Sequence, residues 1–197
     1  MFRCKNVPAK LAVVIFAAAI LALGCQSKGG ETMKLEVTSK AFQNGQPIPK
    51  KYTGEGEDLS PPIAWKGLPP QTKEIALICD DPDAPTAEPW VHWVIYKIPG
   101  STAELPEGVP RDLRLKTPAG AMQGKNSWPD DPQDKAGNIG YRGPMPPRGH
   151  GVHHYHFKVY ALKGELDVQP GLTKKALLEA MKNLIIAEGE LIGTYQR

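Results

Sequence analysis

Frequent Gly and Pro residues are the feature that most restricts how this chain can fold. The sequence holds 20 Gly and 20 Pro among 197 residues, and they divide the chain into short runs. Long helices are disfavoured, because Pro lacks a backbone donor and Gly weakens helix interiors. Several runs between them are rich in β-branched and aromatic side chains, which favours strands. We therefore predict a mainly β protein, a β-sandwich with a central antiparallel sheet.

Three runs are the strongest strand candidates. "EIALIC" at 74–79 is continuously apolar, as expected of a strand that is buried on both faces. Cys79 ends this run and is expected to be a buried, inert thiol. "WVHWVIYKI" at 90–98 and "HHYHFKVYAL" at 153–162 combine aromatic and β-branched residues, which also favours strands.

Near the C-terminus the apolar period changes from that of a strand to that of a helix. Thr173 can cap a helix in which Leu177, Met181 and Leu184 share one face. Gly189 is expected to stop this helix, and "ELIGTYQR" is expected to form a last short strand. We predict that the helix lies at the periphery of the sandwich.

The first 25 residues have the pattern of an export signal. Three basic residues precede an apolar stretch at 11–23, and Gly24 stands before Cys25. This arrangement is typical of secretory signals, and the cysteine makes it similar to a bacterial lipoprotein signal. Such signals usually carry Leu three positions before the cysteine, where this chain has Ala22. Ordinary secretion with an incidental Cys25 is the alternative.

The predicted organisation is a signal peptide at 1–25, a flexible tether at 26–33 and one domain at 34–197. Lipidation of Cys25 would anchor the chain to a membrane without spanning it. The protein would then be exported and held at the cell envelope, on the periplasmic or outer-membrane face in a cell with two membranes.

Charge gives no reason to expect a nucleic-acid partner. Three of the 24 basic residues lie in the predicted signal, which holds no acidic residue, so 21 basic residues face 21 acidic ones in the rest. The net charge of +3 therefore belongs to the export signal. The electrostatic footprint of nucleic-acid binding is missing from the predicted mature chain.

Four of the five histidines lie within seven positions, directly behind a Gly/Pro-rich loop. They are His150, His153, His154 and His156. Because side chains alternate along a strand, His153 and Tyr155 share the face of Phe157 and should lie where the core opens toward the loop. His154 and His156 fall on the opposite, mixed polar face.

A metal site is one alternative for this histidine cluster. The spacing of His154 and His156 on one strand face can chelate a metal. A further ligand would have to come from His92 or Asp81, and His153 points to the other face. We therefore expect no metal site and no other cofactor.

Carboxylates and the fifth histidine form the other half of a candidate site. Asp81 and Asp83 follow a buried strand in a Pro-held turn, where they either cap the turn or point into a cleft. His92 lies in the next strand and should face inward together with Val94 and Tyr96. Two inward histidines at strand starts beside an acidic strand exit favour a pocket over isolated core histidines.

Such a pocket suits a small oxyanion. An Asp can hold each imidazole in one tautomer, while imidazole N–H groups and the Tyr155 hydroxyl point at the ligand. Trp90, Trp93 and Met145 are candidates for the apolar wall. We expect no catalytic residue, because the sequence has no G-x-S-x-G motif and Cys79 should be buried.

Four motifs occur in a characteristic order: "DPDAP" at 81–85, "HW" at 92–93, "GPMPPRG" at 143–149 and "HHYHFKVYAL" at 153–162. Together with the tail "LLEAMKNLIIAEGELIGTYQR", they resemble the phosphatidylethanolamine-binding protein family. The likeness is closest to the bacterial Raf-kinase-inhibitor-like branch and runs from about residue 34 to the end.

The resemblance implies a β-sandwich with one peripheral pocket for phosphate-type anions. By motif position, the pocket residues would be Asp81, Asp83, Trp90, His92, Pro147, His153 and Tyr155. The partner would be a small anion or a phospholipid head group, bound without catalysis. Lipoprotein-type export is not a feature of the cytosolic eukaryotic members, so their kinase regulation is not carried over.

Two alternative functions stay open. An inhibitor or regulator of a protein partner, such as a kinase or a protease, would use the rim of the pocket. A phosphoester hydrolase would use Asp81 with His153 or His92 as acid and base. The acidic insert at 128–138 is longer than the family pattern and is expected to reshape the pocket mouth.

Overall fold

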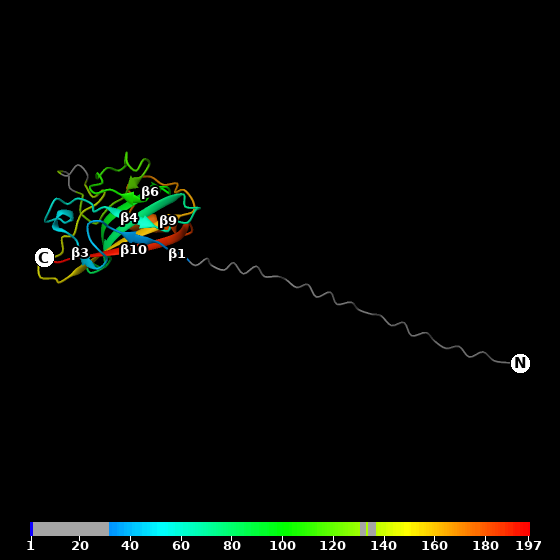
Figure 1. Ribbon diagram of the computed structural model, residues 1–197, viewed down its shortest axis with the longest axis horizontal. Coiled ribbons are helices and arrows are strands. Elements are labelled where there is room, and N and C mark those ends of the chain that lie inside the picture. The colour runs from blue at the N-terminus through cyan, green and yellow to red at the C-terminus, as the bar shows by residue number, and fades with distance from the viewer. Residues whose placement is uncertain (2–31, 131–132, 134–136) are drawn as a thin grey trace.

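The computed structural model describes residue 1 and residues 32–130, 133 and 137–197 (Figure 1). The predicted signal peptide with Cys25, and the predicted tether up to residue 31, lie outside the described residues. Met33, which the sequence places in the tether, is already the first residue of a strand. Within the described part, no helix has both the length and the apolar character needed to cross a membrane.

The described residues form ten strands, one α-helix and one short 3-10 helix. In chain order these are β1 (Met33–Lys34), β2 (Glu36–Thr38), β3 (Gln46–Pro47), the 3-10 helix η1 (Lys50–Tyr52), β4 (Ile63–Lys66), β5 (Glu74–Asp81), β6 (Trp90–Pro99), β7 (Glu104–Leu105), β8 (Met122–Gln123), β9 (His153–Leu162), α1 (Lys174–Met181) and β10 (Ile185–Tyr195).

The strands form two sheets, as the prediction of a mainly β sandwich requires (Figure 1). The larger sheet has the order β1-β10-β9-β5-β6-β8, and β3 also pairs with β10. Its middle is antiparallel, but the short strands β1 and β3 both run parallel to β10, so the complete sheet is mixed. The smaller sheet has the antiparallel order β2-β4-β7. The sandwich prediction is confirmed.

The large sheet is buried on both faces at its centre. All eight residues of β5 are buried, as its continuous apolar run predicts. On one face, Phe157 belongs to a core that also contains Trp65 from the smaller sheet. On the other face, Leu177 and Met181 of α1 complete a second core. Cys79 is buried as predicted, and burial raises the pKa of its thiol well above the ordinary value.

The C-terminal helix begins as predicted but ends earlier. Thr173 caps it, because its hydroxyl oxygen accepts a hydrogen bond from the backbone N–H of Ala176. The helix ends at Met181, so Leu184 lies outside it. The single short strand expected after Gly189 is instead the 11-residue strand β10.

The prediction that Gly189 stops the helix is wrong, because Gly189 lies inside β10. A Cβ atom at this position would lie 2.4 Å from the Leu35 carbonyl oxygen and 2.8 Å from the Leu35 Cβ. The N-terminal segment packs against β10 here, and only a residue without a side chain permits that approach. Gly189 is therefore required by tertiary packing.

Replacing Gly189 with Ala is expected to lower the free energy of unfolding by about 1–3 kcal/mol, because the added methyl group overlaps backbone atoms. Urea unfolding followed by tryptophan fluorescence measures this loss. Gly164→Ala is the matched control, since its Cβ would meet only the Leu184 side chain, at 3.2 Å. Equal stabilities of the two variants would contradict the packing role of Gly189.

Candidate functional site

The order of strands in the large sheet brings three strand ends together. β5 lies between β6 and β9 and is antiparallel to both, so its exit lies beside the starts of its two neighbours. A cavity of about 250 Å³ opens at this end of the sheet. It is lined by Asp81, Ala84, Pro85, Thr86, Trp90, His92, Trp128, Met145, Pro146, Pro147, His153 and Tyr155.

Six of the seven residues expected at the pocket line this cavity, and their role in ligand binding stays a prediction. The exception is Asp83. Its carboxylate accepts a hydrogen bond from the His154 backbone N–H at 2.8 Å and lies 2.7 Å from the His154 Nδ1. Partial burial works to raise the pKa of Asp83, but the bonds from His154 outweigh it and lower the pKa. Asp83 therefore joins the turn after β5 to the start of β9, outside the cavity.

A buried hydrogen bond joins Asp81 to His153. The His153 Nδ1 donates to the Asp81 Oδ2 over 2.7 Å, and the two side chains are only 1% and 4% exposed. The other carboxylate oxygen of Asp81 accepts the Asp83 backbone N–H at 2.9 Å. Because both oxygens are held, the carboxylate fixes the orientation of the imidazole, as predicted for one of the two pocket histidines.

The second nitrogen of His153 is engaged by His150. The His150 Nδ1 lies 2.8 Å from the His153 Nε2, so one proton is shared between the two rings. The loop can return His150 to this position because Gly149 and Gly151 adopt φ angles of +74° and +91°, which favour glycine. Both nitrogens of His153 therefore have protein partners.

A β-bulge turns His92 toward the cavity. Cys79 pairs with Trp93 whereas Asp80 pairs with Val91, so His92 is an extra residue in β6. Bulges of this kind re-aim a side chain next to functional sites. The His92 ring contacts the Tyr155 ring edge-on, with 4.9 Å between the ring centroids.

The predicted grouping of His92 with Val94 and Tyr96 is therefore wrong. Val94 and Tyr96 belong to the core beneath α1, on the other face of the sheet. The bulge breaks the two-residue alternation on which that prediction relied. The conclusion that His92 faces inward holds nonetheless, since its side chain lines the cavity.

His92 is held by the backbone and not by an Asp. Its Nδ1 lies 2.6 Å from the Arg142 carbonyl oxygen, which can only accept, so Nδ1 carries the proton. Burial lowers the pKa of His92 to about 4, although the same carbonyl bond works in the opposite direction. At neutral pH the ring is uncharged, and its Nε2 is a bare acceptor without a partner among the described residues.

The Tyr155 hydroxyl is the most unusual polar group of the cavity. The side chain is almost fully buried, and its oxygen has no hydrogen-bond partner among the described residues. Burial raises the pKa of this hydroxyl far above its ordinary value, so it stays protonated. A buried hydroxyl without a partner costs about 1–3 kcal/mol, and a bound ligand with an acceptor would remove that cost.

The apolar wall differs from the predicted one. Trp90 and Met145 line the cavity, but Trp93 lies in the core and donates from its indole N–H to Gln123. Trp128 replaces it, with its ring edge-on to His92 at a centroid distance of 4.9 Å. The sequence signal for Trp128 was its position as a single aromatic residue at the start of the acidic insert. This end of the insert does shape the cavity.

The histidines on the outer face of β9 have other partners. His154 contacts Asp83, and the His156 Nδ1 lies 2.7 Å from a Glu190 carboxylate oxygen. The third ligand required for a metal site would be His92 or Asp81, and both line the cavity on the opposite face. Among the described residues, no three His, Cys, Asp or Glu side chains gather where they could hold a metal ion.

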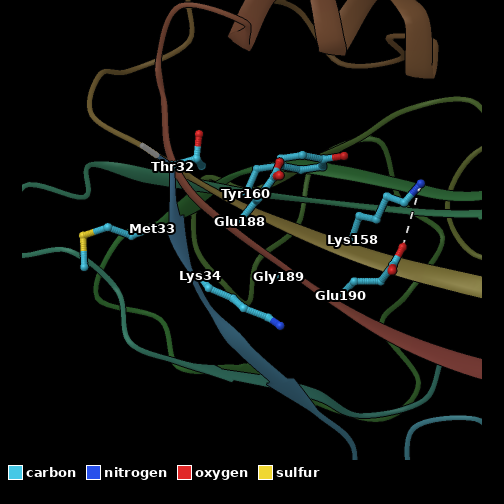
Figure 2. A pocket seen from close by; sticks show the side chains of 8 residues that line it. All are labelled: Thr32, Met33, Lys34, Lys158, Tyr160, Glu188, Gly189 and Glu190. Carbon is cyan, nitrogen blue, oxygen red and sulfur yellow. Dashed lines mark ion pairs between the residues drawn. The ribbon is translucent and has the colours of Figure 1, made fainter. Parts of the chain in front are cut away.

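A larger hollow of about 540 Å³ lies beside β1, on the outer face of the sheet (Figure 2). It is lined by Thr32, Met33, Lys34, Lys158, Tyr160, Glu188, Gly189 and Glu190. Lys158 lies 3.9 Å from Glu190 and 3.7 Å from Asp80, so its charge is already balanced. None of the lining side chains has a buried polar atom without a partner. The smaller cavity is therefore the better candidate site.

With this geometry established, known proteins identify the family. The sequence profile described as "Phosphatidylethanolamine-binding protein" matches residues 38–196. The chain belongs to the phosphatidylethanolamine-binding protein family. This confirms the resemblance seen in the four motifs, and the matched segment lies within the predicted domain at 34–197.

Individual members of the phosphatidylethanolamine-binding protein family are similar over most of the chain. A UPF0098 protein of Pyrococcus horikoshii is 45% identical over 185 residues, which cover 94% of this chain and 88% of the relative. The crystal structure of Escherichia coli YbcL has a TM-score of 0.73 at 33% identity, covering 83% of this chain and 98% of YbcL. A family homologue from Chlamydia trachomatis has a TM-score of 0.70 at 39% identity, with the same coverage of both chains.

The neutral state of His92 makes stability depend on pH. Its pKa is about 4 in the folded protein against 6.5 in an unfolded chain, so the unfolded state binds more protons between these values. Lowering the pH from 7 to 4.5 should therefore remove roughly 2 kcal/mol of unfolding free energy through this group.

Urea unfolding at several pH values measures this loss. His92→Gln should show a shallower decline over the same range. Parallel curves for the wild type and His92→Gln would rule out a buried neutral imidazole at this position.

Proposed function

We propose that the cavity binds a small oxyanion, such as phosphate or a phosphate-bearing head group, and that it does so without catalysis. The observation that carries this proposal is the Tyr155 hydroxyl, which is buried, has no partner among the described residues and belongs to a side chain that lines the cavity. A donor left in this state is stabilised only when a ligand supplies an acceptor oxygen. The proposal agrees with the family, whose members act as binding proteins and as regulators.

The walls of the cavity suit a small ligand with one polar end. Trp90, Trp128 and three prolines contribute stiff, mostly apolar surface, and Asp81 and the two histidines contribute polar surface. Pockets of this composition fix a ligand by a few polar contacts and exclude water around the rest. A volume of about 250 Å³ fits a phosphate with a short substituent.

The chemistry of the lining supports binding over turnover. The Tyr155 hydroxyl stays protonated, and the buried Cys79 thiol has a strongly raised pKa, so neither is an activated nucleophile. Asp81 and His153 are tied to each other and to the neighbouring loop. The hydrolase alternative would need one of these groups to act as a base on a bound phosphoester.

A protein partner is the second candidate, and the rim of the cavity favours it. Met145 lines the opening and is 43% exposed, and Val152 in the adjoining loop is 49% exposed. Exposed apolar side chains beside a pocket are typical of protein docking sites. A partner that docks here would cover the mouth and compete with the small ligand.

Replacing Tyr155 with Phe should separate binding from folding. Removing the hydroxyl should weaken phosphate binding about tenfold, because the ligand loses a buried donor. The same change should leave the unfolding free energy equal or up to about 1 kcal/mol higher, because an unpaired buried group disappears. Isothermal titration of the full-length protein with phosphate, acetate and phosphoethanolamine, together with urea unfolding, measures both effects.

His156→Ala is the control for this experiment, since His156 lies on the outer face of β9 and should bind phosphate like the wild type. A Tyr155→Phe variant that keeps full affinity would remove the hydroxyl from the site. No binding of any of the three ligands to the wild type would overturn the proposed function.

We propose further that the protein is exported and anchored through a lipid on Cys25. The basic start, the apolar stretch at 11–23 and the Gly-Cys pair support this assignment. Cys25→Ser should move the protein from the membrane fraction to the soluble fraction, and it should abolish labelling with radioactive palmitate. Unlabelled wild-type protein, recovered as a soluble chain cleaved at the same place, would support ordinary secretion instead.

A further inference from the structure

The hydrogen-bonding groups of the cavity are unusual for an anion site. No lysine or arginine among the described residues lines it, and the ionisable side chains in its wall are Asp81, His92, His153 and Tyr155. Anion sites commonly present an arginine, a lysine or several backbone N–H groups. Three of the lining residues here are prolines, which have no backbone N–H.

Among the described side chains that line the cavity, the remaining donors are few and uncharged. The Tyr155 hydroxyl has no partner among the described residues, and the lining residues Trp90 and Trp128 each carry one neutral indole N–H. His153 already uses its Nδ1 on Asp81 and its Nε2 on His150. The Thr86 hydroxyl donates to the Glu88 carbonyl, so toward the cavity it can only accept.

The acceptors are stronger than the donors. The His92 Nδ1 proton is committed to the Arg142 carbonyl, which leaves the lone pair of Nε2 unused. Asp81 accepts one hydrogen bond on each oxygen, and each oxygen can accept another. An oxyanion without a hydrogen would place its oxygens against these lone pairs, whereas a P–OH group would donate to one of them.

The geometry points to a cavity that recognises a protonated phosphate, in which one P–OH group donates to the His92 Nε2 or Asp81 while another oxygen accepts from Tyr155. This inference rests on the proposed function and narrows its ligand class. Inorganic phosphate and the terminal phosphate of a phosphomonoester carry such a hydrogen. Sulfate and the phosphodiester of an intact phospholipid head group do not.

A matched pair of ligands tests the inference directly. At pH 5.5, below the second pKa of a phosphomonoester at about 6, monomethyl phosphate and methyl methylphosphonate both carry a single negative charge. The two compounds differ at one substituent on phosphorus: monomethyl phosphate has a hydroxyl group where methyl methylphosphonate has a methyl group. Isothermal titration of the full-length protein should show monomethyl phosphate binding about ten- to a hundredfold more tightly.

Two further comparisons distinguish a free phosphate or phosphomonoester from the phosphodiester of a lipid head group. Inorganic phosphate should bind more tightly than sulfate by a similar factor, and dimethyl phosphate, which has the diester chemistry of a lipid head group, should bind as weakly as methyl methylphosphonate. His92→Phe keeps an aromatic ring and removes the bare nitrogen, so it should reduce the preference for the P–OH group to about threefold or less. His156→Ala should keep the wild-type preference.

The outcomes separate this inference from the proposed function. Equal affinities for monomethyl phosphate and methyl methylphosphonate would overturn the inference and leave oxyanion binding intact. A lack of binding by every probe would overturn both. A His92→Phe protein that folds, as shown by a cooperative melting transition, and keeps the full preference would overturn the role of His92.

Discussion

The hydrogen bond between Asp81 and His153 is the constraint on which the rest of the site depends. It joins the exit of β5 to the start of β9 through two side chains that are only 4% and 1% exposed. Removing one partner of such a buried pair typically costs about 3–5 kcal/mol, since the remaining group is left unpaired. With His153 fixed by Asp81, its outer nitrogen can meet only His150, and the loop in front of β9 is held over the site. The same bond that orders the cavity therefore occupies His153, and the polar groups left for a ligand are those of Tyr155, His92 and Asp81.

Strand alternation predicted one half of the site correctly and failed in the other half for an identifiable reason. β9 pairs with β5 without a register shift, so His153 and Tyr155 face the core side while His154 faces outward. β6 pairs with the same strand but carries a bulge at His92, and residues on the two sides of the bulge no longer alternate in phase. A bulge is a property of a pair of strands, and the sequence of β6 alone contains no signal for it. The family motif includes His92 among the pocket residues; its side chain lines the cavity, and its role in binding stays a prediction.

Contacts between distant segments explain the other differences. Local sequence around Gly189 predicts the end of a helix. In the fold, its missing side chain lets the backbone of Leu35, more than 150 positions earlier, pack closely against β10. Trp128 reads as part of an acidic loop, and only the folded chain places its ring against His92. The sequence assigns no role to His150, because a side chain in a Gly-rich loop has no defined direction until the loop conformation is known. The fold class, by contrast, follows from many local signals that agree with one another.

The position of the cavity within the sheet bears on which ligand reaches it. β1 pairs with β10 at Ala187, whereas the cavity end of β9 pairs with β10 at Tyr195, so the two sites lie about 25 Å apart along one strand. β1 and the C-terminus lie at opposite ends of the domain (Figure 1). An anchor on Cys25 would attach at the β1 end and leave the cavity at the far end, where a ligand from solution has direct access. This arrangement and the excess of acceptors among the described lining side chains favour the same ligand. It is a soluble phosphate or phosphomonoester with a P–OH group that can donate a hydrogen bond.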